Sequence, residues 1–548
     1  MTVPTPSRWL FGPLPDLLLG CGGAYLIVFA LLVGAGPAFE GVVPHAMMPL
    51  LVLVTSIPHY GATLLRVYEE PGELRRYRLF AVWISLLVYG WFAVAVFDPF
   101  LGSLMVTLYL TWSPWHYSGQ NYGIAMMFLG RRGIALAPET KRWLYASFLL
   151  SFVLAFLGIH TAGSVDSYAP GSLEPEAFGL LRLGVPPALA AWLLFAAALG
   201  YGVSLAVVAG SLLRTASARD LAPVAALVGL QGLWFSAPVL ARATGVFGDW
   251  APFGGDARFR EYAFLWVAIG HAVQYLWVTS YYAVRAADTG RRVRHLGKAT
   301  AAGGVAFGLP LLVFGPDALG RHGYDAGLAL LIASAVNLHH FVLDGAIWKL
   351  RDGRIARVLL RAGEATSEVG AAGFGRLART ALLVFGAVYA LSFGYATIER
   401  ELGVRRAQLR EDFERMAVAA RRLRWVGRDD ASLRHNLAIG ALRRGDLAAA
   451  RSEVERSLAL QPTPRTWVLA GMLRQREGDA AGEQAAYEQA VALDAGHVPA
   501  LVRLAAVRER AGDRVGAREA LGRALEVDPA RDDLRARRDA LASGPAPD

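Results

Sequence analysis

The sequence of 548 residues has a single cysteine, Cys21, which excludes any internal disulfide bond and any metal site built from several thiolates. It also has only three lysines, so nearly all of its basic residues are arginines. No Walker loop, glycine-rich dinucleotide turn or serine-histidine-aspartate elbow occurs, which excludes the common nucleotide-binding and hydrolase sites. Any chemistry of this chain must therefore use other residues.

Apolar residues are abundant. They make up 55% of the chain, charged residues make up 18%, and the mean hydropathy is +0.37. A chain of this length and composition is too apolar for a water-soluble protein, so we expect it to lie in a lipid bilayer. The formal net charge is +10, but many arginines fall where apolar runs end. We therefore expect no nucleic-acid partner.

Runs of apolar residues divide the first 398 residues. A helix needs about 17–25 apolar residues to cross a bilayer. Eleven runs are candidates, the ninth being short and rich in glycine: 15–36, 44–66, 77–97, 102–129, 143–162, 184–213, 221–242, 261–284, 299–315, 324–349 and 379–398. The sequence therefore predicts an all-α protein with a polytopic transmembrane domain over residues 1–398.

The arginines between these runs predict the orientation. Loops after even-numbered spans are basic, as at Arg75, Arg76 and Arg78 and from Lys349 to Arg361, whereas loops after odd-numbered spans are mostly acidic or neutral. Positively charged loops stay in the cytoplasm. We therefore expect a bacterial inner-membrane protein with a cytoplasmic N-terminus, and residues after Ile398 on the extracytoplasmic (periplasmic) side.

The C-terminal part is charged, rich in alanine and repetitive. The phrases "RRGDLAAA", "REGDAAGE" and "RAGDRVGA" recur every 33 to 34 residues, with small residues at matching positions on both sides. This pattern resembles the tetratricopeptide repeat (TPR) over residues 431–529. The resemblance implies a TPR α-solenoid over 431–548 that binds a protein or peptide partner, preceded by a helical connector or cap over 399–430.

Five of the eleven histidines fall inside predicted spans. They are His59 on span 2, His116 on span 4, His271 on span 8, and the pair His339 and His340 on span 10. All four spans are even-numbered, so their helices run in the same direction and place the histidines in one broad middle layer. Polar side chains in hydrocarbon are costly unless they face the bundle interior and find partners.

Each of three histidines has a polar residue one helical turn further along. Such a neighbour can bind the second imidazole nitrogen and fix the ring, as around metal-bound histidines. The expected supporting residues are Gln120 for His116, Gln274 and Tyr275 for His271, and Asp344 for His340. Because neighbouring helical residues project about 100° apart, we predict His340 as a metal ligand and His339 as a nearby reserve. A set of imidazoles without cysteine suits iron, copper or zinc.

The phrases "IPHYGAT" and "SPWHYSGQNYG" around His59 and His116 resemble those of the membrane-integral bacterial β-carotene-cleaving dioxygenases. The resemblance covers residues 44–350. It implies four histidines, His59, His116, His271 and His340, that hold one non-haem iron, with dioxygen and a long apolar polyene in the bundle. The implied function is a metal-dependent oxygenase acting on a lipophilic, lipid-like substrate. Aromatic residues near the histidines are predicted to line the substrate channel: Tyr60, Trp115, Tyr117, Tyr122, Phe341 and Trp348.

Two other function classes remain open. Lipid-linked sugar transferases of the polyprenyl-phosphate type share the order of spans and repeats, and their acidic base lies in the first outer loop, where this chain offers Glu40 and His45. A non-enzymatic transporter or envelope scaffold would use the histidine-aspartate pairs to relay protons. Neither alternative requires the histidines of different spans to meet.

Overall fold

The computed structural model describes residues 7–69, 71–162, 178–245, 257–287, 292–320, 322–348, 358–360 and 376–543. The described residues are almost entirely helical, and their only β-structure is one isolated bridge between Thr161 and Val185. The basic stretch expected after the tenth span lies outside the described residues over 349–357. The chain forms two compact units, one of residues 1–313 and 329–397, the other of 314–328 and 398–548.

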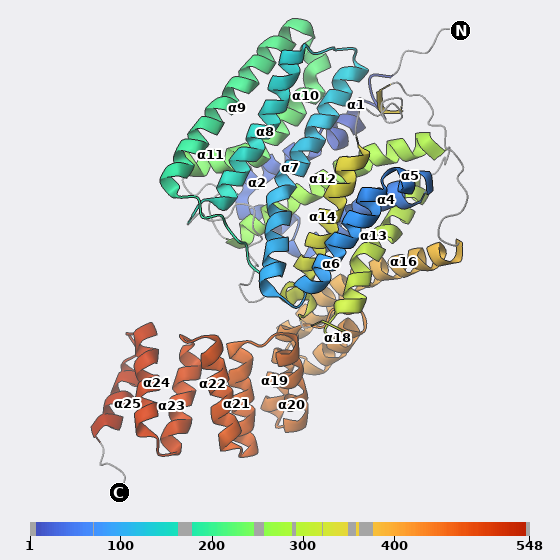
Figure 1. The fold of residues 1–548 in the computed structure, drawn as a ribbon. Coiled ribbons are helices and arrows are strands. Elements are labelled where there is room, and N and C mark those ends of the chain that lie inside the picture. Colours follow the sequence, from blue (N-terminus) through green and yellow to red (C-terminus); the bar gives the residue numbers. More distant parts are fainter. Residues whose placement is uncertain are drawn as a thin grey trace. The chain divides into compact units, whose positions relative to one another are not determined.

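The first unit is a bundle of long helices with short helices between them (Figure 1). Its α-helices are α1 (Pro13–Pro15), α2 (Gly23–Ala35), α3 (Phe39–Val42), α4 (Met48–Tyr68), α5 (Pro71–Arg76), α6 (Ser85–Ala95), α7 (Pro99–Arg131), α8 (Pro138–His160), α9 (Pro187–Thr215), α10 (Ala218–Gln231), α11 (Ala237–Thr244), α12 (Ala257–Ala287), α13 (Arg292–Phe314), α14 (Ala329–Ile347) and α16 (Arg376–Ile398).

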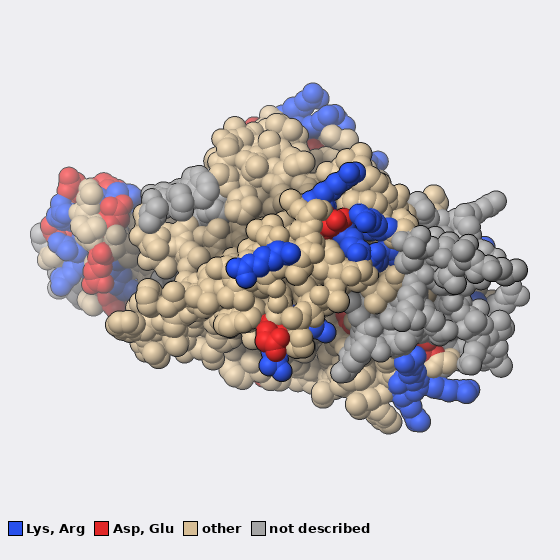
Figure 2. Space-filling view, turned by 90° about the horizontal axis from the view of Figure 1, so that it is seen from above, with Lys and Arg blue, Asp and Glu red and all other residues tan. Residues whose placement is uncertain are grey.

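Eight helices among the described residues are long and apolar enough to cross a membrane, and a ninth apolar helix, Leu79–Ala95, is shorter. These nine match nine of the predicted spans. The predicted spans 102–129 and 261–284 coincide with α7 and α12, which are long but do not reach the same hydropathy. Both helices carry several Ser, Thr, His, Gln and Tyr side chains, so their composition reflects polar groups turned into the bundle. Most of the surface visible in Figure 2 is formed by residues other than Lys, Arg, Asp and Glu.

Glycines make the expected ninth span a packing surface. A Cβ atom on Gly303 of α13 would lie 1.9 Å from the carbonyl oxygen of Ile57 on α4. A Cβ on Gly304 would lie 2.0 Å from the carbonyl oxygen of Gly386 on α16. Small residues let helices approach closely in membranes, where dispersion contacts drive association. The glycine-rich composition of α13 therefore serves contact with two neighbouring helices.

Four helices carry the histidines expected inside spans and surround one region of the bundle. The helix α4 packs against α12 and α14, and α14 also packs against α7. Side chains bridge the remaining pair, α7 and α12, since Gln120 Nε2 donates to Gln274 Oε1 at 2.7 Å. Pro58 and Pro114 lie inside α4 and α7, shortly before His59 and His116, and each interrupts the backbone hydrogen-bond ladder there.

The second unit contains the π-helices η6 (Tyr324–Leu328) and η7 (Glu399–Val404), followed by further α-helices. These are α17 (Arg405–Leu409), α18 (Phe413–Trp425), α19 (Ala431–Arg444), α20 (Leu447–Leu460), α21 (Pro464–Glu477), α22 (Ala480–Leu493), α23 (Val498–Arg510), α24 (Arg514–Val527) and α25 (Asp532–Ser543). From α19 to α24 they pack as three successive hairpins, coloured orange to red in Figure 1.

The repeated Gly-Asp phrase forms the turn of each hairpin. Gly445, Gly478 and Gly512 adopt positive φ angles of 79°, 79° and 83°, a conformation that favours glycine at a helix C-terminus. The following aspartates, Asp446, Asp479 and Asp513, cap the next helix by accepting backbone N–H bonds. One dipeptide therefore ends one helix and begins the next.

The segment between α13 and α14 belongs to the second unit. Asp317 forms ion pairs with Arg456 at 2.8 Å and with Arg424 at 3.3 Å. The Gly323 amide donates to the carbonyl oxygen of Leu460 at 3.3 Å, and the guanidinium of Arg428 lies 4.0 Å from the ring centre of Tyr324. Residues 314–328 are thus held against α18 and α20.

Candidate metal centre

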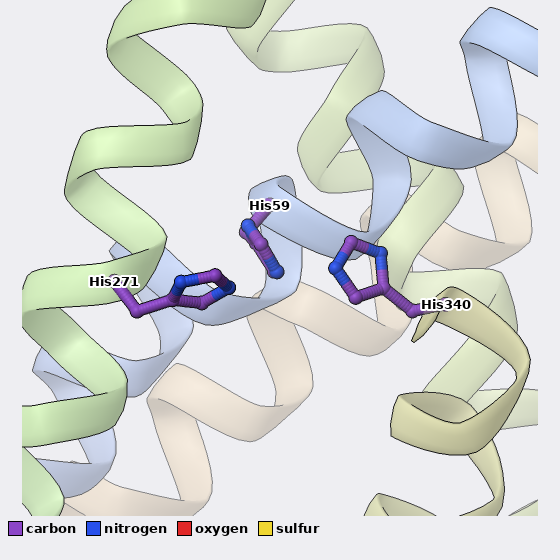
Figure 3. A group of neighbouring side chains, drawn as sticks. All are labelled: His59, His271 and His340. Atoms are coloured by element: carbon purple, nitrogen blue, oxygen red, sulfur yellow. The ribbon is translucent and has the colours of Figure 1, made fainter. Parts of the chain in front are cut away.

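Four of the predicted histidines meet inside the first unit. His59 comes from α4, His116 from α7, His271 from α12 and His340 from α14. His59, His271 and His340 are buried, and each offers a ring nitrogen within 4.8 Å of those of the other two. Figure 3 shows these three side chains pointing toward one another from their separate helices. His116, His340 and Asp344 form a second such group.

The four imidazole rings contact one another in a closed cycle. Ring centres are 4.3 Å apart for His59 and His340, and 5.0 Å apart for His340 and His116. The cycle continues with 4.9 Å between His116 and His271, and closes with 5.0 Å between His271 and His59. Each ring therefore touches two others, and the two groups of ligand atoms form one cluster with His340 as the shared member.

Each ring of the cluster keeps one buried nitrogen that has no hydrogen-bond partner among the described residues. These atoms are Nδ1 of His59 and Nε2 of His116, His271 and His340. A buried polar atom left without a partner costs about 1–3 kcal/mol. Four such atoms in one cluster would be a large penalty, and a shared cation would remove it.

The spacing of the rings fits such a cation. A metal–imidazole bond is about 2.0–2.1 Å long, which puts adjacent ring centres around one ion about 4.5–5.2 Å apart. The four contacts of the cycle measure 4.3–5.0 Å. The ring spacing therefore fits a metal bound by neighbouring imidazoles of the cycle, and the ligand atoms close enough to share one fall into two groups of three that both contain His340.

Hydroxyl groups next to His340 determine which of its nitrogens is free. The Thr63 hydroxyl on α4 donates to Asp344 Oδ1 at 3.0 Å, and the Tyr275 hydroxyl donates to the same oxygen at 2.7 Å. The two hydroxyls also lie 2.5 Å from each other. In the arrangement in which Thr63 gives its one hydrogen to Asp344, its oxygen accepts from Nδ1 of His340, 3.0 Å away. The proton of His340 is thereby assigned to Nδ1, which leaves the lone pair on Nε2 facing the cluster.

Asp344 has a wider role than the expected support of His340 alone. Its Oδ2 lies 3.3 Å from Nε2 of His340 and 3.9 Å from Nε2 of His116. Its Oδ1 is occupied by Thr63 and Tyr275, and the indole of Trp348 donates to the Tyr275 oxygen at 2.9 Å. This carboxyl group therefore ties α14 to α4 and α12 and lies beside two of the histidines.

The two glutamines do not support the histidines as the spacing predicts. Gln120 donates to Gln274 at 2.7 Å and to the backbone oxygen of His271 at 3.3 Å. Gln274 in turn donates to the backbone oxygen of Gly20 at 2.9 Å. Tyr275 also serves Asp344 rather than His271. All three side chains thus bind partners on other parts of the chain.

His339 does not join the cluster. Its Nε2 lies 2.7 Å from the Ser85 hydroxyl and 3.3 Å from the Tyr68 hydroxyl, and its ring packs on Tyr89. The step of about 100° between neighbouring helical residues turns it toward α4 and α6. Its inclusion among the candidate metal ligands is therefore corrected, and it is a hydrogen-bonded core residue.

A cavity of about 320 Å³ adjoins the cluster between α7, α12 and α14. His116 and Asp344 form part of its wall, together with Gln120 and Tyr275. The rest of the lining is mainly tryptophan, glycine and aliphatic residues: Trp112, Trp115, Gly119, Gly123, Ile124, Met127, Val278, Phe341, Gly345, Trp348 and Leu359. This apolar space with a few polar groups at one end is typical of a small-molecule site.

Three of the six aromatic residues expected to line a channel do so: Trp115, Phe341 and Trp348. Tyr60 packs on His59 and donates to Asn337 at 2.7 Å, and Tyr117 packs on His271 with ring centres 4.2 Å apart. Both contact the cluster but are absent from the cavity lining. Tyr122 packs on Tyr145 and Phe148, away from it. These three tyrosines therefore lie outside the lining of this cavity, and each ring packs on a partner inside the bundle.

Sequence reasoning missed Thr63 and the glycines of the cavity. Thr63 lies four residues after His59, the same spacing as between His340 and Asp344, but the sequence analysis gave it no role at the site. Gly119 and Gly123 follow His116 at three and seven residues, so they share its face of α7. That spacing was a usable signal.

Neither the protein-family models nor the curated protein sequences compared with this chain gave a match.

Proposed function

We propose that this chain is an integral membrane oxygenase whose four-histidine cluster holds a non-haem iron and whose substrate is a lipophilic, polyene-like or lipid-like molecule bound in the adjoining cavity. Copper and zinc are the other metals that imidazole ligands suit. His59, His116, His271 and His340 would hold the metal, with Asp344, Thr63 and Tyr275 supporting them.

One observation carries the proposal: four unpartnered imidazole nitrogens from four helices lie in one buried cluster. His45 and His295 each have one such nitrogen as well, but they lie apart from the cluster, so the argument depends on four of these nitrogens gathering in one place. If the four histidines were independent core residues, their gathering at one place would have no explanation.

When bound, iron at such a site supplies binding and reduction of dioxygen at coordination positions that the protein leaves open. The residues of the chain prepare that site. Thr63 and Asp344 hold the ring of His340 so that Nε2 faces the cluster, and Phe341 stacks on His116 with ring centres 4.4 Å apart. Trp112, Trp115 and Trp348 keep the cavity apolar, which favours a lipophilic substrate over water.

The remaining architecture is proposed on sequence grounds and on the helix pairs described above. Eleven membrane crossings would leave the N-terminus in the cytoplasm and the C-terminal unit on the extracytoplasmic side. The hairpins from α19 to α24, with their Gly-Asp turns, support tetratricopeptide repeats that bind a protein or peptide partner.

The test is metal analysis of the purified full-length protein. We expect about one iron per chain in the wild type, and a loss of at least tenfold in bound iron for His116→Ala and His340→Ala. His339→Ala is the matched control, because this neighbouring histidine is equally buried but binds Ser85 instead. It should keep the metal.

Two results would contradict the proposal. If the wild-type protein bound no transition metal after reconstitution, the oxygenase function would be ruled out. Sugar transfer that depends on Glu40 would then favour the polyprenyl-phosphate-dependent transferase. Equal metal content in all four proteins would place the metal elsewhere. In that case a proton-relaying transporter would become the better account of the cluster.

A further inference from the structure

We infer that the cavity opens sideways into the bilayer between α7 and α14, at Gly119 and Gly345, and that an apolar molecule dissolved in the membrane enters there. This inference relies on the proposed function only for the identity of the reaction. The binding of an apolar molecule in the cavity does not depend on it. It assigns an entrance and two specificity-determining residues that the histidine cluster alone does not reveal.

Glycines form the gap in the cavity wall. Gly119 on α7 and Gly345 on α14 both line the cavity and are both solvent-exposed in the isolated chain. A Cβ atom built on either would meet no heavy atom within 4 Å, and the same holds for Gly123, one turn beyond Gly119. At Gly303 and Gly304 of α13, by contrast, neighbouring helices leave no space for a Cβ atom. The glycines of the cavity therefore leave open space instead of bringing helices together.

The two helices touch at Phe341, near one end of the cavity. Phe341 of α14 packs on His116 and lies 6.2 Å, centre to centre, from Trp112 of α7. Beyond His116 the cavity follows α7 as far as Met127. Eleven residues of helix span about 16 Å. The space is thus elongated, with the histidine cluster near the end where the helices touch.

The chemistry of the opening fits hydrocarbon and not water. Trp112, Trp115 and Trp348 line the cavity, together with Ile124, Met127, Val278 and Leu359. The polar groups of the lining, His116, Gln120, Tyr275 and Asp344, are partly or fully buried. A molecule entering between α7 and α14 would lie mainly against apolar side chains, with polar contacts limited to His116, Gln120, Tyr275 and Asp344. The occupant is therefore a slender apolar molecule, such as an acyl chain or a conjugated polyene.

Binding can be measured without turnover. cis-Parinaric acid, a conjugated fatty acid, accepts excitation energy from tryptophan, and three tryptophans line the cavity. In full-length protein we expect saturable energy transfer, with affinity about tenfold weaker in Gly119→Leu and in Gly345→Leu. Gly210→Leu is the matched control, because Gly210 is also an exposed helical glycine with open space around its Cβ position, but lies on α9 outside the cavity. It should bind like the wild type.

Iron content measured on the same samples separates the two proposals. Glycine-dependent probe binding in a protein that takes up no metal would support the entrance and remove the oxygenase. Iron-loaded Gly119→Leu and Gly345→Leu proteins that bind the probe like the wild type would overturn the entrance and leave the oxygenase standing.

A second measurement blocks the opening after the protein has folded, in case the leucine variants do not fold. Gly345→Cys in a Cys21→Ala background is purified and then labelled with benzyl methanethiosulfonate, a lipid-soluble thiol reagent. Labelling should abolish saturable probe binding, and bound probe should slow the labelling. Full labelling with unchanged probe binding would overturn the entrance.

Discussion

Thr63 on α4 contacts His340 on α14, with 3.0 Å between the hydroxyl oxygen and Nδ1, and donates its own hydrogen to Asp344. A threonine 277 residues away in the sequence thus sets the proton position of an imidazole in the cluster. This relationship gives the hydroxyl a measurable role.

Removing the Thr63 hydroxyl should weaken metal binding. Thr63→Val keeps the shape of the side chain but frees the Nδ1 proton of His340, and loss of such a supporting bond typically costs about 10–100-fold in metal affinity. Thr63→Ser should restore most of the affinity. Competition with a chelator measures the effect. Equal affinities in the valine and serine variants would show that the hydroxyl does not orient the ring.

Enlarging a glycine of α13 should destabilise the bundle. Gly304→Leu would force its side chain against the backbone of Gly386, and overpacking costs about 1–3 kcal/mol. We expect a lower apparent Tm in detergent. Gly202→Leu on α9 is the control, because its Cβ position is open. A Gly304→Leu protein as stable as that control would contradict the close approach of α13 and α16.

The second hairpin of the C-terminal unit has a buried carboxylate where the others have alanine. Glu483 of α22 is buried and pairs with Arg510 of α23 at 2.6 Å, whereas the matching Ala450 and Ala517 are fully buried. Arg510→Ala should lower stability by about 1–3 kcal/mol, because it leaves the carboxylate without its ion pair. Adding Glu483→Ala should recover most of the loss. Calorimetry of the three variants checks this, and a harmless Arg510→Ala would contradict it.

The segment before α14 and the helical repeats should lie on the same side of the membrane. Asp317 and Gly323 bind residues of the C-terminal unit, so a bilayer cannot separate them. Cysteines placed at Leu319 (65% exposed) and Val515 (82% exposed), each in a Cys21→Ala background, should react with an impermeant maleimide from the same side of sealed vesicles. Labelling from opposite sides would be incompatible with the ion pair of Asp317 and Arg456.

Mild acid should destabilise the C-terminal unit. Burial, followed by the charge of Arg465, lowers the pKa of His435 below its ordinary value of 6.5. Below pH 6.5 the unfolded chain therefore gains a proton that the folded unit resists, and stability falls as the pH drops. Calorimetry between pH 7.5 and 5.5 should show a declining Tm, less steeply in His435→Asn. An identical slope in that variant would exclude the histidine as the cause.

Local sequence patterns predicted many of the helices and turns of this chain. Apolar runs predicted the long helices, because crossing a bilayer requires about 20 apolar residues in sequence order. The Gly-Asp phrases marked three hairpin turns, because a positive φ angle and a helix cap are properties of adjacent residues. The same locality separates His340 from His339, since the helical step alone turns them to different faces.

Contacts between helices were decided by the tertiary structure alone. Gln120 and Gln274 bind each other instead of the imidazoles one turn away, and Tyr122 packs on Tyr145 instead of lining the cavity. Residue spacing within one helix could not predict these contacts, because the partners of each side chain lie far away in the sequence.

The sequence by itself thus determined that the histidines would lie at similar heights along long apolar helices, because helical rise fixes the position of each residue along its helix. Only the tertiary structure decided that four of them turn toward a common centre, that Thr63 and Asp344 orient one ring, and that glycines leave a cavity beside them. Height along a helix is set by the helical rise, whereas rotation about its axis is set by the packing of its neighbours.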